Sequence, residues 1–241
     1  MLGTNQPNPP RENRLLAALS AAEYQRLIPN LEFVELALKQ VLYKPSEQIA
    51  HVYFPHRAIV SLTYTLEDGS TSEVGMVGNE GMAGLPVILG GDNTTTTAIV
   101  QGADGGMRMR ADQLKAEFNR GGELQSLLLR YTQGLLTQIT QTAACNRHHS
   151  IEERLARWLL MVSDRTESNT FSLTQEFLSE MLGVRRAGVT VAAGTLNQAG
   201  IIRYNRGKID ILDRESLEAT SCECYPVVKK ELTRLLGIAC G

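Results

Sequence analysis

The chain has 241 residues, of which 43% are hydrophobic and 21% are charged, and its formal net charge at pH 7 is −2. This composition indicates a globular protein with one large or two small domains, and the near-neutral charge argues against indiscriminate binding to polyanions. Residues 1–12 are polar and rich in proline, so we expect a disordered tail without a signal peptide. No apolar run approaches the length of a membrane span, and we therefore expect a cytoplasmic protein without a membrane partner.

The first half of the chain predicts a β domain over residues 13–118. A helical segment over roughly 13–31 begins this domain, and short strand-like segments follow between about 33 and 110. These segments alternate in polarity or are rich in β-branched residues, and turn sequences such as "EDGS" and "GGDN" separate them: "HVYF", "AIVSLTYTL", "TSEVGMV", "TAIVQ" and "MRMR". Several short strands at this spacing predict a small barrel or a jelly roll.

A long helix is expected next, with residues 119–148 forming a dimerisation helix and hinge. Five apolar residues recur there at steps of three and four and form one stripe: Leu124, Leu128, Tyr131, Leu135 and Ile139. A long helix with one narrow stripe between two domains often pairs with its own copy, and we favour this interpretation. The alternative is that the stripe packs against the chain's own barrel.

A second domain is predicted over residues 149–220, followed by a helical extension over 221–241. Ser150 and Glu153 fit a capping box, which places the start of a helix and the domain boundary. Helices are expected over 174–182 and 185–199. The segment "IIRYNRGKIDIL" then predicts a hairpin with its turn at Asn205-Arg206-Gly207.

The two predicted helices around Gly183 have the pattern of a helix-turn-helix with a β-hairpin wing. Glycine tolerates the positive φ that the turn requires. Apolar residues recur where the two helices would pack together: Leu178, Leu182, Val184, Val189 and Ala192. The 26 acidic residues in the chain would place about three in the 29 residues from Met181 to Ile209, yet this window contains none and carries five basic residues. A basic patch on a near-neutral protein indicates a nucleic-acid contact, and the alternative is a helical hairpin of a structural protein.

If the second helix enters a DNA major groove, its outward residues near the N-terminus meet base edges. Arg186 is the candidate for two hydrogen bonds to guanine, and Arg185 for a phosphate contact. Thr174 is interpreted either as a phosphate contact or as a plain helix cap, and the wing residues either as phosphate contacts or as a solvated turn. Val191 either meets a thymine methyl group or is partly buried. The predicted DNA-binding residues are Thr174, Arg185, Arg186, Ala187, Thr190, Val191, Arg206 and Lys208.

This arrangement resembles the Crp/Fnr family of bacterial transcription regulators. The resemblance rests on "RLARWLL" and "LTQEFLSEMLGVRRAGVTVAAGTLNQAGII" followed by a wing, and it covers nearly the whole chain. It implies an α+β fold: an N-terminal jelly roll like a cyclic-nucleotide-binding domain, a long dimerisation helix and a C-terminal winged helix-turn-helix. It also implies a homodimer that binds a pseudo-palindromic operator in double-stranded DNA, with RNA polymerase as a further partner.

The chain departs from the family in both functional regions. The family's recognition helix typically begins with Ser-Arg-Glu, and only the central arginine is kept here, as Arg186. The family's nucleotide cassette needs a glutamate for the ribose and an arginine for the phosphate, but no arginine lies between Met82 and Val100. A buried phosphate without a cation is costly, so we expect that cAMP is not the effector. The corresponding effector pocket would be Gly81, Met82, Ala83, Gly84, Leu85, Thr95, Thr96 and Thr97, with Glu80 as a loop residue.

Other cofactors and functions are less well supported by the sequence. The iron–sulfur branch of the family needs an N-terminal cysteine cluster, and no cysteine precedes Cys145. His51 and His56 are interpreted as structural rather than as haem ligands. Neither the Cys145, His148, His149 group nor the Cys222, Cys224 pair has the spacing of a standard zinc motif, so no metal ligand is predicted and the roles of these cysteines and of Cys240 stay open.

The effector therefore stays unknown, with haem and an iron–sulfur cluster disfavoured along with cAMP. No catalytic motif or credible acid–base constellation is present, so we do not expect an enzyme. The alternative to a DNA-binding regulator is a ligand or redox sensor whose C-terminal domain mediates protein contacts.

Overall fold

The β domain begins with short helices and continues as two antiparallel sheets. The computed structural model describes residues 12–238, so Cys240 and all of the predicted tail except Glu12 lie outside the described residues. The elements of this domain are α1 (Arg14–Ala17), α2 (Ala21–Leu27), the 3-10 helix η1 (Ile28–Asn30), β1 (Glu32–Leu36), β2 (Val41–Tyr43), β3 (His51–Pro55), β4 (Ile59–Thr65), β5 (Thr71–Val77), α3 (Pro86–Leu89), β6 (Thr97–Gly102), β7 (Asp104–Arg110) and α4 (Ala111–Asn119).

The two sheets have the strand orders β1-β7-β3 and β2-β6-β4-β5. The five strand-like segments of the sequence correspond to β3 to β7, while β1 and β2 were not predicted individually. Val52, Phe54 and Met109 are buried in the core that the sheets enclose, and Phe54 pairs in register with Met107 across β3 and β7. Alternate residues of these strands point into one core, which is the arrangement expected for two packed antiparallel sheets.

The long helix α5 (Glu123–His148) packs its apolar stripe against the β domain of the same chain. Leu124, Leu128, Tyr131 and Leu135 are all buried in the core cluster of that domain, and Ile139 packs against it. The favoured interpretation of this stripe as a self-pairing surface is therefore wrong for these five residues. The stripe is buried because the chain's own sheets and helices cover it.

The C-terminal domain is built around α6 (Ile151–Thr166). The predicted start of α6 is confirmed, because Ser150 and Glu153 form the predicted capping box. The remaining elements are β8 (Thr170–Ser172), α7 (Gln175–Leu182), α8 (Arg186–Gln198), β9 (Ile202–Asn205), β10 (Lys208–Ile211) and α9 (Arg214–Thr220). Helix α6 is buried along most of its length, and its core also includes Ile59 and Met76 of the β domain, so the two domains share apolar contacts.

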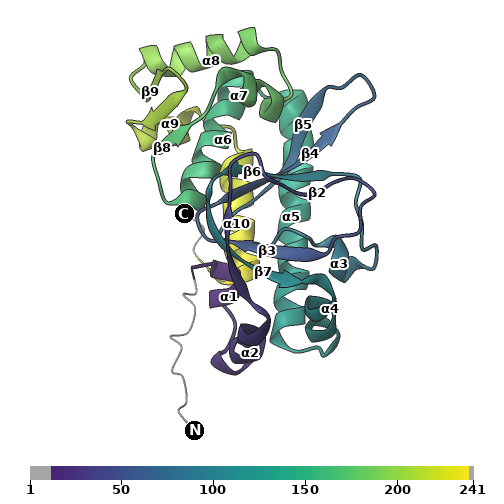
Figure 1. Cartoon of the computed structure of the whole chain (residues 1–241). Helices are drawn as coiled ribbons and strands as arrows, with labels where there is room; N and C mark the ends of the chain where they lie inside the picture. Colours follow the sequence, from purple (N-terminus) through teal and green to yellow (C-terminus); the bar gives the residue numbers. More distant parts are fainter. Residues whose placement is uncertain (1–11, 239–241) are drawn as a thin grey trace.

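The last helix, α10 (Cys224–Leu236), leaves the C-terminal domain and returns to the long helix. Figure 1 shows α10 beside α5 in the middle of the molecule, with the C-terminal domain above them. The contact is close at Gly134, where an added Cβ atom would lie 2.6 Å from Leu232. Val228, Leu232 and Leu236 thereby join the core of the β domain. Within the described part of the chain, no helix combines the length and the apolar character needed to cross a membrane.

Candidate functional site

The turn between α7 and α8 has the geometry that the sequence predicts. Gly183 ends α7 with a φ of 60°, and the backbone N–H of Val184 donates to the carbonyl of Ser179. Leu178, Leu182 and Val189 are buried between the helices. Gly183 also lies against the β domain, because an added Cβ atom would come within 2.6 Å of the Ser72 hydroxyl on β5. The helix pair is therefore held by its own core and by one strand of the other domain.

The predicted outward face of α8 is exposed. Arg185 caps the helix, and Arg186, Ala187 and Thr190 follow on its open side. Val191 is 71% exposed, which excludes the partly buried alternative. These residues are held on a rigid helix and point away from the core, so the face is available to a large ligand.

The two glycines of α8 have different environments. An added Cβ atom at Gly188 would lie 2.6 Å from Ile151 Cδ1, so this glycine lets α8 approach the first turn of α6. Nothing lies within 4 Å of a Cβ atom at Gly194. A side chain at Gly188 would therefore require the end of the Ile151 side chain to move, whereas the structure gives no packing reason for Gly194.

The first turn of α7 supports the exposed face of α8. The Thr174 hydroxyl accepts a hydrogen bond from the backbone N–H of Phe177, which is the predicted helix cap. Gln175 was not predicted as a site residue. Its Oε1 atom accepts from Arg186 Nε at 3.4 Å and from the Thr190 hydroxyl at 3.1 Å. Its position directly after the cap was the available signal. Gln175 thus orients the arginine that is the main candidate for a specific contact.

The wing is the antiparallel sheet β8-β10-β9. Arg206 and Gly207 form its two-residue turn with φ angles of 48° and 80°, a backbone that suits the twist of a hairpin. Arg206 is exposed at the tip, and Lys208 lies 3.6 Å from the carboxylate of Asp210. Lys208 is therefore partly neutralised within the protein, and Arg206 is the stronger candidate for an anion contact.

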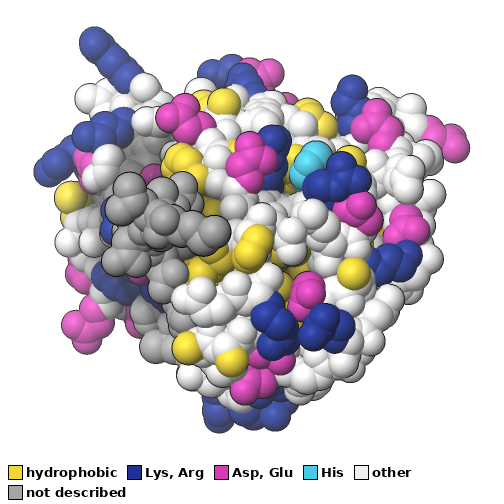
Figure 2. Space-filling view, turned by 60° about the horizontal axis from the view of Figure 1, so that its bottom comes forward, with side chains coloured by type: hydrophobic (Ala, Val, Ile, Leu, Met, Phe, Trp, Pro, Cys, Tyr) yellow, Lys and Arg dark blue, Asp and Glu magenta, His cyan; other side chains and the backbone are white. Residues whose placement is uncertain are grey.

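On the face that Figure 2 shows, the basic side chains of the described residues do not form one patch. Figure 2 shows the face that includes the bottom of Figure 1, where basic and acidic side chains are interspersed. By contrast, the five basic residues between Met181 and Ile209 have no acidic residue among them in the sequence. The helix-turn-helix and its wing are therefore the favoured place for a polyanion.

A cavity of about 210 Å³ lies where the effector pocket was predicted. Met82, Ala83, Gly84, Leu85 and Thr96 line it, but Gly81, Thr95 and Thr97 do not. Gly81 instead lies directly against the Tyr131 side chain, which leaves no room for a ligand there. The remaining lining is mainly apolar and contains no charged side chain: Tyr43, Leu62, Val74, Pro86, Leu89, Thr94, Thr132, Leu135, Leu136 and Ile139.

A larger groove of about 600 Å³ lies between the two domains and was not predicted. Arg57 and Gln101 line it from the β domain, and Trp158 and Phe171 line it from the C-terminal domain. The sequence could not indicate this groove, because its walls come from segments that are distant in the chain.

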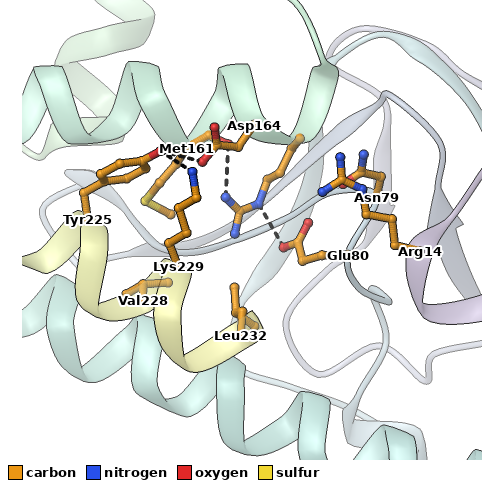
Figure 3. Close-up of a pocket in the computed structure, with 10 residues that line it drawn as sticks. Arg14, Asn79, Glu80, Met161, Asp164, Tyr225, Val228, Lys229 and Leu232 are labelled. Atoms are coloured by element: carbon orange, nitrogen blue, oxygen red, sulfur yellow. Dashed lines mark hydrogen bonds and ion pairs between the residues drawn. The ribbon is translucent and has the colours of Figure 1, made fainter. Parts of the chain in front are cut away.

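A buried ion pair joins the two domains beside α10. Arg165 of α6 donates from Nε to Glu80 at 2.8 Å, and both side chains are almost fully buried. Figure 3 shows Glu80 and Asn79 on one side of this junction and Tyr225 and Lys229 of α10 on the other. Glu80 is therefore a structural ion-pair partner, and its burial was not apparent from its loop sequence.

A second buried carboxyl group, that of Glu73 on β5, lies at the same domain junction. Its Oε1 atom accepts from Trp158 Nε1 at 3.0 Å, and its Oε2 atom accepts from the Ser61 hydroxyl. Burial raises the pKa of Glu73 from 4.5 to about 7, and the two hydrogen bonds oppose this rise only in part. The group therefore titrates near neutral pH.

Two cysteine motifs that lie far apart in the sequence meet in space. Cys145 and His149 lie one turn apart at the end of α5, and Cys222 and Cys224 lie where α9 leads into α10. The three sulfur atoms and one histidine nitrogen all lie within 4.8 Å of one another. His148, by contrast, is exposed outside the group. A hydrogen bond from the Cys145 thiol lowers the pKa of Cys222.

Known proteins match both the C-terminal helix-turn-helix region and the fold of most of the chain. Residues 153–220 match the family described as the Crp-like helix-turn-helix domain, and no curated protein sequence matches the chain. A solved protein from Eubacterium rectale, described as a regulator of the Crp/Fnr family, is 17% identical, with 88% of this chain and 99% of that chain covered and a TM-score of 0.64. FixK2 from Bradyrhizobium japonicum is 16% identical, with 80% and 98% covered and a TM-score of 0.64.

A Crp/Fnr family regulator from Thermus thermophilus is 22% identical, with 79% of this chain and 98% of that chain covered and a TM-score of 0.64. At these identities the likeness establishes a shared fold. The chain therefore has the fold of Crp/Fnr-type transcriptional regulators, and its C-terminal domain is a Crp-like helix-turn-helix domain. The resemblance stated from the sequence is confirmed at this level.

Proposed function

We propose that the protein is a dimeric, sequence-specific DNA-binding regulator of transcription. The observation that carries the proposal is the exposed, acid-free face of α8 on a Crp-like helix-turn-helix domain, with Arg186 oriented by Gln175. In the major groove, Arg186 would donate to a guanine edge, while Arg185 and the wing residue Arg206 would meet phosphates. If the protein activates transcription, RNA polymerase would be a further partner.

The dimer would form through the face of α5 that the chain leaves uncovered. Leu129 and Leu136 are 50% and 59% exposed, and they lie seven residues apart on one side of the helix. A seven-residue apolar repeat is the spacing of a paired-helix seam. Two copies joined there would present two α8 helices to a pseudo-palindromic site.

The apolar cavity in the β domain would take a small, uncharged ligand rather than cAMP. A buried phosphate needs a cationic or strongly donating partner, and no charged side chain lines this cavity. Neither haem nor an iron–sulfur cluster is part of this proposal.

Gel-shift assays with fragments of the host's promoter regions test DNA binding. We expect binding that weakens steeply as salt rises, because phosphate contacts release counterions. Arg186→Ala should reduce specific binding more than non-specific binding, by about 1–3 kcal/mol at the guanine it reads, whereas Arg206→Ala should weaken both alike. Equal losses in the two variants would contradict the residue roles, and salt-resistant association with a protein would instead support a protein-binding domain.

A further inference from the structure

We infer that Cys145, His149, Cys222 and Cys224 bind a single tetrahedral zinc ion. Three thiolates and one imidazole form a common structural zinc set. Zinc–sulfur bonds of about 2.3 Å and zinc–nitrogen bonds of about 2.0 Å at tetrahedral angles place ligand atoms roughly 3.5–3.8 Å apart. The distance from Cys145 Sγ to Cys222 Sγ is 3.4 Å, and that from Cys224 Sγ to His149 Nδ1 is 3.7 Å.

The orientation of His149 supports a metal ligand. Its Nδ1 atom faces the Cys224 sulfur, while its Nε2 atom lies 3.0 Å from the carboxylate of Glu223. The Glu223 carboxylate beside Nε2 favours the tautomer with its proton on Nε2, which leaves the lone pair of the neutral ring on Nδ1, directed into the group. Metal-bound histidines usually have their second nitrogen held by a carboxylate in this way.

The charges around the group also fit an anionic metal site. Zinc with three thiolates carries one net negative charge. Arg154 and Arg157 are buried beside it, and each buries its Nε atom without a hydrogen-bond partner. Arg154 donates from Nη2 to the Leu182 carbonyl and Arg157 donates to the Thr142 hydroxyl, and within residues 12–238 neither has a carboxylate among its hydrogen-bond partners. A buried cation is stable only with compensation, and an anionic metal site beside these two arginines would supply it.

The compactness of the group argues for one ion. All four ligand atoms lie within 4.8 Å of one another, whereas an iron–sulfur cluster places iron and sulfide ions between its ligands and spreads them further apart. A disulfide between Cys145 and Cys222 would use only two of the four ligands. A disulfide would not explain why His149 lies between the Cys224 sulfur and the Glu223 carboxylate.

The position of the site indicates its effect. Cys145 and His149 end α5, and α6 begins at Ile151, so the ion would lie at the hinge between the long helix and the C-terminal domain. Cys222 and Cys224 belong to the segment that returns to α5. Zinc would therefore link the two segments that connect the domains, namely the junction of α5 with α6 and the junction of α9 with α10. This inference does not rest on DNA binding.

Metal analysis of the purified full-length protein tests the inference. Under reducing conditions and without chelators, we expect about one zinc per chain. Replacement by Co²⁺ should produce the thiolate-to-metal charge-transfer absorption of a tetrahedral sulfur-rich site. His149→Ala should lose most of the bound metal, and His148→Ala, the exposed neighbour, should retain it. Glu223→Gln should weaken zinc binding about 10-fold to 100-fold in competition with a chelating indicator.

Several results would overturn the assignment. The first is a metal-free protein with reduced thiols that gives no charge-transfer band with Co²⁺. The second is a content of several iron atoms per chain, and the third is a Cys145–Cys222 disulfide in protein isolated under reducing conditions. Equal metal content in the His148 and His149 variants would also overturn it. The metal content of the unmodified protein and the histidine pair decide the question even if cysteine variants do not fold. Loss of DNA binding with full zinc content would count against the proposed function and not against this site.

Discussion

The buried carboxyl of Glu73 makes the stability of the protein depend on pH in a specific way. Its pKa is raised from 4.5 to about 7, so the folded state binds more protons than the unfolded state between these two values. Stability rises with pH only where the unfolded state binds more protons, and here the opposite holds. The contribution of Glu73 is therefore fully present below about pH 4.5 and is lost as the pH rises through about 7.

Glu73→Gln isolates this contribution, because glutamine resembles the protonated acid. The amide oxygen can accept from Trp158, and the amide nitrogen can donate to the Ser61 hydroxyl, in place of the present bonds. A pKa rise from 4.5 to about 7 corresponds to about 3 kcal/mol of differential free energy. Relative to the unmodified protein, the variant should gain about this much free energy of unfolding between pH 4.5 and pH 8.

Urea unfolding at pH 4.5, 6 and 8 measures the difference. Glu67→Gln, at an exposed site in the connection between β4 and β5, is the matched control and should follow the pH profile of the unmodified protein. Parallel profiles for the Glu73 variant and the unmodified protein would refute the reasoning. They would mean that the Glu73 carboxylate is ionised and stabilised in the folded state at neutral pH.

Three further predictions concern packing and assembly. Glu80→Gln removes the carboxylate that pairs with the buried Arg165 guanidinium and should lower the free energy of unfolding by about 3–5 kcal/mol in denaturant titrations. An unchanged midpoint would contradict this estimate. Gly194→Ala should stabilise the protein by about 0.5–1 kcal/mol, because the added methyl group meets nothing. Gly188→Ala should stabilise it less, because the end of the Ile151 side chain must move aside, and a higher thermal midpoint for Gly188→Ala than for Gly194→Ala would contradict this contrast. Leu136→Glu should convert a dimer to a monomer in light-scattering measurements if α5 forms the seam, and a persistent dimer would place the interface elsewhere.

The features that local chemistry determines could be predicted from the sequence. The αL turn at Gly183, the capping box at Ser150 and the exposed face around Arg186 all depend on residues within a few positions of one another. The strand segments of the β domain were also recognisable, because alternation and turn residues are local signals. The turn at Gly183 and the pattern of the two helices around it were sufficient to predict the helix-turn-helix, and the hairpin sequence predicted its wing.

The features that depend on distant contacts could not be predicted. The stripe of α5 indicates that one side of the helix is buried, but not whether a second copy or the chain's own sheets cover it. Glu80 is buried because Arg165, 85 residues away, reaches it. Cys145 and Cys222 are 77 residues apart, so no spacing rule joins them. A cysteine and a histidine four apart at a helix end, together with a Cys-Glu-Cys segment, were the only available signals.

The return of α10 to α5 restricts how this protein can be recombined with others. A chimera that joins residues 149–238 to a different N-terminal domain would include α10. The apolar face of this helix packs against Gly134 and neighbouring residues of α5 in the present protein. If the helix that replaces α5 does not have a small residue at the same position, the apolar face of α10 would be exposed to solvent and would favour aggregation. A successful exchange would cut after α9 and keep α10 from the recipient, even though α10 follows the helix-turn-helix domain in the gene.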